Sequence, residues 1–63
     1  METIILNFQA AILRTASERL GRPVTEKERA FVTRRGGLVA LESIHDYVST
    51  LPEIQLEQYL NAE

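Results

Sequence analysis

The chain contains no cysteine and a single histidine among its 63 residues. Disulfide bonds are therefore impossible, and a zinc site built on cysteine ligands is excluded. A chain of this length buries only ~60% of the surface that its unfolded form exposes, and its core rarely contributes more than ~3–5 kcal/mol. Close helix packing and self-association are the remaining sources of stability. We therefore expect one domain, residues 1–63, that forms a homodimer and binds no metal or other cofactor.

Residues 2–20 carry apolar side chains at the spacing of an amphipathic helix. A polar or small stripe follows steps of three and four residues, formed by Thr3, Asn7, Ala11, Arg14 and Glu18. The opposite side is apolar and broad, formed by Ile5, Phe8, Ile12, Ala16 and Leu20, with Leu6, Ala10 and Leu13 beside them. This breadth predicts contact with two neighbours. Gly21 suits the left-handed residue that follows a helix, and Pro23 prevents the helix from continuing.

The segment Thr25-Glu26-Lys27-Glu28 has the spacing of a capping box. In that motif the threonine hydroxyl accepts a hydrogen bond from the Glu28 backbone N–H, and the glutamate side chain accepts one from the Thr25 backbone. The pattern predicts a helix over residues 26–35 with Phe31 as its main core residue. Arg34 and Arg35 would then lie at the negative end of the helix dipole.

Two further helices are indicated after residue 37. The first covers residues 38–50 and has two apolar stripes, formed by Leu38, Leu41, Ile44 and Val48 and by Ala40, Ile44, Tyr47 and Leu51. Pro52 suits the first turn of a helix over residues 52–62, with Ser49 or Thr50 as its cap. The sequence therefore predicts an all-α fold, a compact bundle of four short helices.

The corner Arg34-Arg35-Gly36-Gly37 permits three interpretations. As the turn of a DNA-reading helix pair, it should precede a helix that offers Arg, Lys, Asn or Gln to the bases, whereas residues 38–50 offer acids instead. As an anion site, it has backbone N–H groups at a helix start but no phosphate-loop motif. We favour a tight corner in which Gly36 caps the helix with a positive φ and Gly37 allows close helix packing.

Charge is segregated along the chain, although the net charge is only −2. Residues 14–35 hold all seven basic residues and three acids, a net charge of +4, and residues 36–63 hold five acids and no Lys or Arg. Such asymmetry indicates a partner-binding surface, or a dimer in which opposite charges approach each other.

Candidates for catalysis or metal binding are few. Glu42 and His45 have a Glu-x-x-His spacing, but helical two-metal proteins need two such pairs and two more inward glutamates. His45 has no cysteine partner, and Ser43 and Ser49 lack a nucleophile-elbow pattern. We therefore expect no enzyme activity and no catalytic, cofactor or metal site.

The combined features indicate a small non-catalytic protein-interaction module, an adaptor, regulator or inhibitor that covers the surface of a larger protein of unknown identity. An inhibitor encoded by a phage or plasmid would fit this size and acidity. The expected partner-binding residues are Ile5, Leu6, Phe8, Leu13, Arg29, Arg34 and Arg35.

A nucleic-acid-binding regulator is the alternative, using the basic segment 14–35 in a helix–turn–helix-like arrangement. No apolar run is long enough to span a membrane, and the first residues lack the basic region of a signal peptide. The absence of cysteine fits a reducing compartment, so we expect a cytoplasmic protein without membrane partners.

Overall fold

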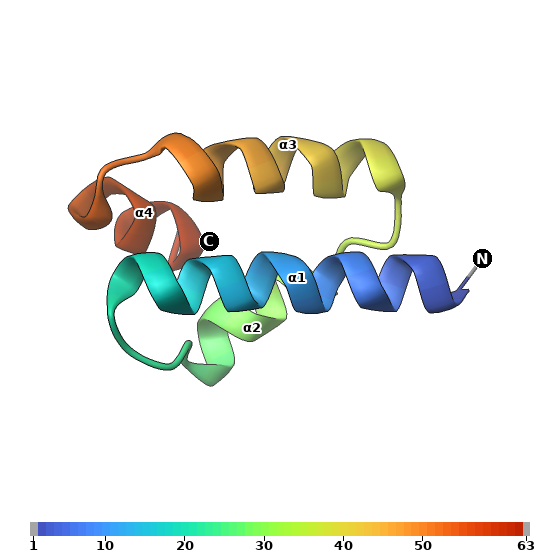
Figure 1. Cartoon of the computed structure of the whole chain (residues 1–63), viewed down its shortest axis with the longest axis horizontal. Coiled ribbons are helices and arrows are strands. Elements are labelled where there is room, and N and C mark those ends of the chain that lie inside the picture. Colours follow the sequence, from blue (N-terminus) through green and yellow to red (C-terminus); the bar gives the residue numbers. More distant parts are fainter. Residues whose placement is uncertain (1, 63) are drawn as a thin grey trace.

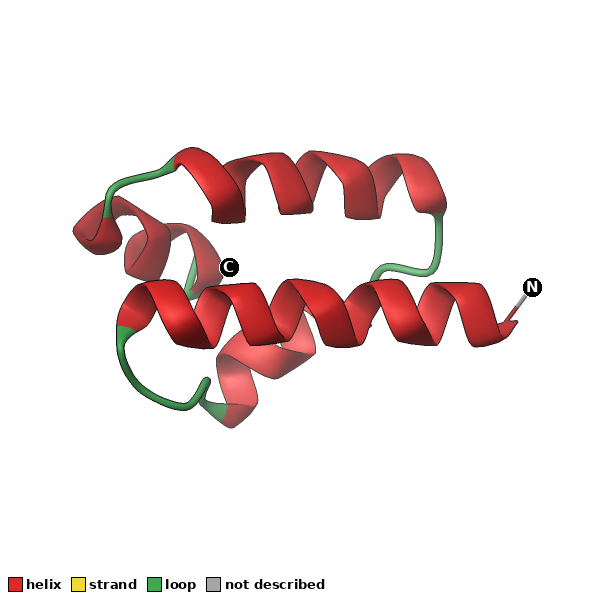
Figure 2. Cartoon of the chain, viewed as in Figure 1, coloured by secondary structure: helices red, strands yellow, loops and turns green. Residues whose placement is uncertain are grey.

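The computed structural model describes residues 2–62, which form four helices (Figure 1). These are α1 (Glu2–Leu20), α2 (Glu26–Thr33), α3 (Leu38–Thr50) and α4 (Glu53–Leu60). Loops connect them, and residues 2–62 contain no strand (Figure 2). The predicted all-α bundle of four helices is confirmed, whereas the homodimer stays a prediction. None of these helices is both long and apolar enough to cross a membrane.

The long helix α1 organises the bundle, because it contacts each of the other three helices. Helices α1 and α3 lie side by side and run in the same direction, so both begin at one end of the molecule (Figure 1). Helix α4 lies at the opposite end, where it also contacts α2. The described chain extends over 33 × 21 × 19 Å.

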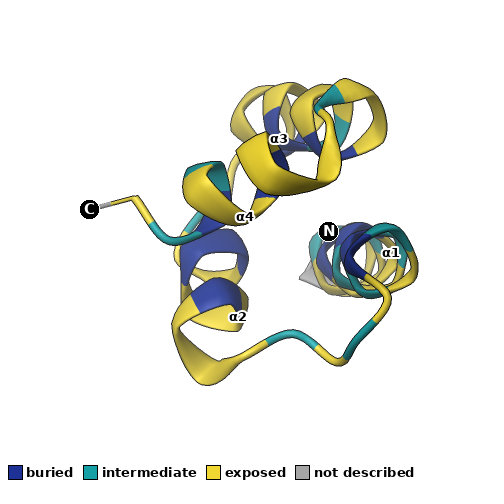
Figure 3. Cartoon of the chain, turned by 90° about the vertical axis from the view of Figure 1, so that its left-hand side faces the viewer, coloured by how far each residue is buried: buried dark blue, intermediate teal, exposed yellow. Residues whose placement is uncertain are grey.

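The core lies along the face of α1 that the periodicity predicted to be apolar (Figure 3). Its buried members are Ile12, Ala16 and Leu20 of α1, Phe31 and Val32 of α2, Leu41, Ile44 and Val48 of α3, and Leu56 and Leu60 of α4. All five residues of the predicted polar stripe of α1 are exposed, namely Thr3, Asn7, Ala11, Arg14 and Glu18. Apolar burial therefore decreases towards the end where α1 begins, since Ile5 and Phe8 are only half-buried.

Helix α1 ends as its sequence predicted. Gly21 has a φ of 71°, the left-handed conformation that favours glycine. The backbone N–H groups of Gly21 and Arg22 donate to the Ser17 carbonyl at 2.9 and 3.3 Å, so the last turn of the helix is closed.

The capping box of α2 is also confirmed. The Glu28 backbone N–H donates to the Thr25 hydroxyl at 3.2 Å, and the Thr25 backbone N–H donates to the Glu28 carboxylate at 2.8 Å. The helix ends at Thr33, two residues earlier than predicted. The Arg35 N–H donates to the carbonyl of Val32, three residues back, at 3.2 Å, so the chain tightens and leaves the helix there.

Two expectations for the glycine corner are wrong. Among the described residues only Gly21 has a positive φ, so Gly36 is no left-handed cap. A side chain added at Gly37 would meet nothing within 4 Å, so this glycine does not permit close helix packing. Gly37 is instead the extended N-cap of α3, with φ −101° and ψ 140°. This conformation is open to any residue.

The expected cap of the last helix is wrong as well. Pro52 occupies the N-cap position of α4 and makes no side-chain hydrogen bond there. The Thr50 hydroxyl donates to the Asp46 carbonyl at 2.7 Å, inside α3, and Ser49 is exposed. The hydroxyl of a helical threonine can always reach the backbone carbonyl one turn back. In Thr50 this hydrogen bond replaces the predicted cap of α4.

Candidate functional site

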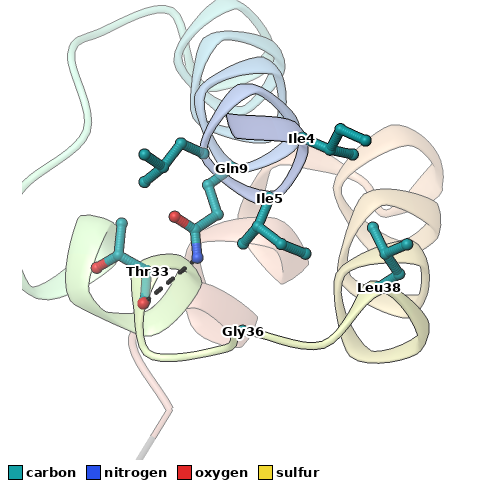
Figure 4. Close-up of a pocket in the computed structure, with 7 residues that line it drawn as sticks. Ile4, Ile5, Gln9, Thr33, Gly36 and Leu38 are labelled. Carbon is teal, nitrogen blue, oxygen red and sulfur yellow. Dashed lines mark hydrogen bonds between the residues drawn. The ribbon is translucent and has the colours of Figure 1, made fainter. Parts of the chain in front are cut away.

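An apolar hollow opens at the end of the bundle where α1 and α3 begin. It has a volume of about 840 Å³. This hollow, called the end groove below, is lined by Ile4, Ile5, Leu6, Gln9, Thr33, Gly36 and Leu38. In Figure 4 the side chains from α1 form one wall, Thr33 and Leu38 lie on opposite sides, and Gly36 lies across from α1. Three separate segments of the sequence therefore build one surface.

Gln9 holds the corner after α2 against α1. Its side chain is buried, and its Nε2 donates to the Arg35 carbonyl at 2.6 Å and to the Thr33 carbonyl at 3.4 Å (Figure 4 shows the second bond). Carbonyls at the end of a helix have no partner within the helix, so a buried amide from α1 satisfies them. The periodicity of residues 2–20 gives no sign of this role, because it depends on carbonyls more than 20 residues away.

Large aliphatic side chains form the rim of the end groove. The exposed fractions are 57% for Ile4, 63% for Leu6 and 41% for Leu38. Successive helical residues differ by about 100°, so Ile4 and Leu6 flank Ile5 on its two sides. The rim is therefore apolar along both α1 and α3.

The predicted partner-binding residues of α1 fall into two groups. Ile5 and Leu6 line the end groove. Phe8 and Leu13 are half-buried and pack against the core. The Phe8 ring contacts the imidazole of His45, with ring centroids 5.9 Å apart. Ile5 also packs against the core, so it has both roles, whereas Leu6 lines only the groove and Phe8 and Leu13 only pack.

The three arginines that were predicted to bind a partner lie in different surroundings. Arg29 and Arg34 are exposed, and Arg34 lines a different hollow, between α2 and the end of α4, together with Phe31 and Leu60. The Arg35 guanidinium lies 4.6 Å from the centre of the Phe31 ring, and it donates to the Phe31 carbonyl at 3.1 Å. Arg35 therefore stabilises the end of α2, and this contact weakens the anion-site interpretation of the corner.

A polar cluster at the far end of the molecule joins α2 to α4. The Glu28 carboxylate is fully buried and accepts two hydrogen bonds from Arg22, at 2.9 and 2.8 Å, and one from Asn61 at 2.8 Å. Arg22 also pairs with Glu57 at 3.1 Å. The hydrogen bonds from Arg22, assisted by those from Thr25 and Asn61, outweigh burial and lower the pKa of Glu28 to about 2. The same contact with Glu28 raises the pKa of Arg22.

This cluster, called the Glu28 network below, uses part of the basic segment for folding. Arg19 is engaged too, since it donates to the Val48 carbonyl at 3.2 Å near the end of α3. At least three of the seven basic side chains, those of Arg19, Arg22 and Arg35, thus make contacts within the fold.

A second, shallower hollow lies between α3 and α4. Its volume is about 620 Å³, and its lining residues are Tyr47, Leu51, Gln55, Gln58 and Tyr59. The Tyr59 ring packs edge-on against Phe31 and beside Tyr47, with centroid distances of 5.0 Å in both cases. Burial raises the pKa of Tyr59. The tyrosines thus form a core edge, with Tyr47 half exposed.

The Glu-x-x-His pair is not assembled into a larger set of ligands. Glu42 is exposed, and His45 packs on Phe8. Within residues 2–62, no group of three or more potential metal-ligating side chains is brought together.

Comparison with protein-family models, curated proteins and solved structures returns no match to this chain. The molecule is therefore characterised by its own fold and site: an all-α bundle of four short helices with an apolar groove at one end.

Proposed function

We propose that the protein is a small non-catalytic interaction module, an adaptor, regulator or inhibitor that covers the surface of a larger protein. The end groove is the observation that carries this proposal, because it exposes Ile4, Leu6 and Leu38 together. Contiguous exposed apolar side chains mark interaction sites in soluble proteins, whereas isolated ones are normal. Ile54, exposed on α4 outside this groove, serves as an isolated example.

The chemistry of the groove indicates what a partner must supply. The lining side chains are aliphatic apart from those of Gln9 and Thr33, and Gly36 contributes only backbone. A protruding apolar side chain of the partner would fill the hollow, as anchor residues do at the centres of interfaces.

Catalysis is less well supported than binding. The groups most suited to proton transfer are committed to packing or to ion pairs, since His45 contacts Phe8 and Glu28 is held ionised by Arg22. A general acid or base needs a pKa near the working pH, and the pKa of Glu28, about 2, is far below it.

The proposal also retains the cytoplasmic location and the homodimer expected from the sequence.

Nucleic-acid binding by segment 14–35 is the weaker alternative. Phosphate binding requires basic side chains that face solvent, and at least three of the seven basic residues make contacts within the fold. Helix α3, which would enter the groove of DNA, exposes Glu42, Ser43 and Asp46. Fluorescence anisotropy with labelled duplex DNA at 50 and 200 mM salt separates the two functions, because phosphate-dominated binding weakens steeply with salt.

The principal test is affinity capture from a lysate of the source cells, followed by binding measurements with the purified partner. The wild type, Leu6→Glu and the matched control Ile54→Glu are compared, because Leu6 and Ile54 are both largely exposed apolar helix residues. We expect the wild type and the control to retain the same protein and Leu6→Glu to lose it. Equal retention by all three chains would refute the end groove as the binding surface.

A further inference from the structure

We infer that a small hollow between α2 and the end of α4 binds an acidic segment of a protein, with one apolar side chain of that segment inside the hollow. This hollow, called the basic hollow below, is lined by Lys27, Ala30, Phe31, Arg34, Leu60 and Ala62. It shares no described lining residue with the end groove. The inference therefore adds a second binding site and does not depend on the proposed function.

The charge of the basic hollow is complementary to an acidic occupant. Lys27 and Arg34 are both exposed and lie seven residues apart, at the start and the end of α2, a separation of about 10 Å along the helix. Among the described residues, none that lines the hollow is acidic. Two acids of the same helices, Glu28 and Glu57, are already paired with Arg22. Carboxylates of a partner therefore supply the missing charge, as they do where basic clusters recognise acidic motifs.

The floor of the basic hollow is apolar. Ala30 and Phe31 lie between the two cations in α2, and Leu60 and Ala62 line the hollow from the end of α4 and the residues after it. The volume is about 130 Å³. A cavity of ~150 Å³ holds one benzene-sized group, whereas pockets for drug-sized ligands measure ~300–1,000 Å³. There is thus room for one apolar side chain, which the occupant must bring together with its acids.

The spacing of the cations fits an extended segment. Side chains two positions apart in an extended chain point to the same side, so an acidic, an apolar and an acidic residue at alternate positions all face the hollow. The two acids are then about 13 Å apart at ~3.3 Å per residue. This separation is close to that of Lys27 and Arg34, whose long side chains cover the difference. The apolar residue between the acids lies over the floor.

A nucleic acid matches the charges of the basic hollow but not its floor. Single-stranded nucleic acids bind by stacking their bases on exposed aromatic rings. The ring of Phe31 is only 8% exposed, with the Arg35 guanidinium 4.6 Å from its centre and the Tyr59 ring packed against it at 5.0 Å. It is therefore not free to stack on a base, and the apolar floor favours a protein segment.

A titration of the isotope-labelled chain, followed through its amide NMR signals at physiological salt, tests the site. Charge attraction then extends only ~8 Å, which suppresses diffuse binding. The probe is a synthetic serine peptide whose central leucine has a glutamate two positions before it and another two positions after it. We expect saturable binding with a dissociation constant below ~1 mM, and signal changes at Ala30, Phe31 and Ala62. The same peptide with serine in place of leucine should bind at least about tenfold more weakly, because it lacks the anchor.

Two variants separate the charge of the basic hollow from its floor. Arg34→Gln removes one positive charge and should weaken peptide binding about threefold to fivefold. Arg29→Gln is the matched control, an exposed arginine of α2 outside the hollow, and should leave the affinity unchanged. Ala30→Leu fills the hollow without changing its charge and should weaken binding at least about tenfold. All three changed residues are exposed, and far-UV circular dichroism establishes that each variant stays helical.

The inference is overturned by a lack of saturable binding, by equal effects of Arg34→Gln and Arg29→Gln, or by an unchanged affinity in Ala30→Leu. An oligothymidylate that binds the same residues more tightly than the peptide would assign the hollow to nucleic acid instead. Leu6→Glu distinguishes this site from the proposed function, because it should abolish capture of the larger protein and leave peptide binding unchanged. Loss of peptide binding in Leu6→Glu would place the peptide in the end groove and overturn the second site.

Discussion

Glu28→Gln removes the negative charge from the Glu28 network while keeping the length of the side chain. Each carboxylate oxygen accepts two hydrogen bonds: Oε1 from Arg22 and the Thr25 backbone, and Oε2 from Arg22 and Asn61. A glutamine amide nitrogen must replace one oxygen, and a nitrogen with two hydrogens accepts nothing there. Whichever way the amide turns, two donors lose their acceptor.

The expected cost follows from two independent quantities. A pKa lowered from 4.5 to about 2 corresponds to about 3 kcal/mol of stability at neutral pH, since each tenfold change in acidity is worth ~1.4 kcal/mol. The Arg22 side chain is 34% exposed, and water screens the pair accordingly, so we discount this to about 2–3 kcal/mol. Two lost hydrogen bonds, one to a charged donor, give a similar ~2–4 kcal/mol. Either value approaches the ~3–5 kcal/mol available to a domain of this size.

Urea denaturation followed by circular dichroism measures the difference between wild type and variant at pH 7 and at pH 3. Sucrose is added equally to both, because it keeps a weakened variant folded. A carboxylate whose pKa is lowered on folding stabilises the protein above its unfolded pKa, and loses that contribution as the pH falls through its folded pKa. For Glu28 this window runs from about pH 5 to about pH 1. The difference should therefore shrink to about 1 kcal/mol at pH 3.

Glu26→Gln is the matched control, because Glu26 lies in the same first turn of α2 but is exposed. It loses only an interaction with the helix dipole, worth ~0.3–1 kcal/mol. The reasoning is refuted if Glu28→Gln destabilises the protein no more than Glu26→Gln does. A large difference that does not change between pH 7 and pH 3 would also refute it, since it would then arise from packing and not from charge.

Three further predictions concern the helices, and each is measured by thermal or urea unfolding. Thr25→Ala removes the hydroxyl that accepts from the start of α2 and should cost about 1 kcal/mol; an unchanged midpoint would contradict the cap. Gly21→Ala forces a side chain into a positive φ and should destabilise by about 1 kcal/mol, whereas Gly37→Ala, with an extended backbone and open space, should be neutral or slightly stabilising; the reverse order would contradict the assignment of these two turns. Ile12→Ala should cost about 2–5 kcal/mol because Ile12 is fully buried, and Phe8→Ala should cost less because Phe8 is half-buried; equal losses would show that Phe8 belongs to the closed core.

Local signals in the sequence were sufficient for the helices. The capping box at Thr25 and the left-handed Gly21 involve only residues within five positions of each other. Such contacts depend on backbone geometry that every helix end shares, so they are readable without a tertiary structure. The error at Gly36 has the same origin, because the rule for glycine at a helix end was applied where a distant amide, Gln9, supplies the partner.

The polar contacts that organise the molecule were not predicted. Gln9 meets a carbonyl 26 residues away, and Asn61 meets Glu28 across 33 residues. In a one-dimensional pattern a glutamine in an apolar face and a glutamate in a capping box both look like surface residues. The ionised Glu28 tolerates complete burial because the loop after α1 supplies Arg22 and the packing of α4 against α2 supplies Asn61.

The candidate site shows the same division. The sequence pattern predicted Ile5 and Leu6 as partner-binding residues on the apolar side of α1, and the structure places both in the end groove. It could not distinguish them from Phe8 and Leu13, which share the apolar side of α1 and pack against the core without lining the groove. Periodicity reports which side of a helix is apolar, while the neighbours decide how far along the helix that side is covered.

By itself, then, the sequence determined that this chain is all-helical, where its helices begin and end to within two residues, and which side of α1 is solvated. These properties depend on local hydrogen bonds and on side-chain period. Only the tertiary structure decided that Glu28 is buried, that Gln9 closes the end of α2, and that Leu38 joins Ile4 around one hollow. Those outcomes depend on the parallel approach of α1 and α3 and on the docking of α4, which are set by packing between residues far apart in the chain.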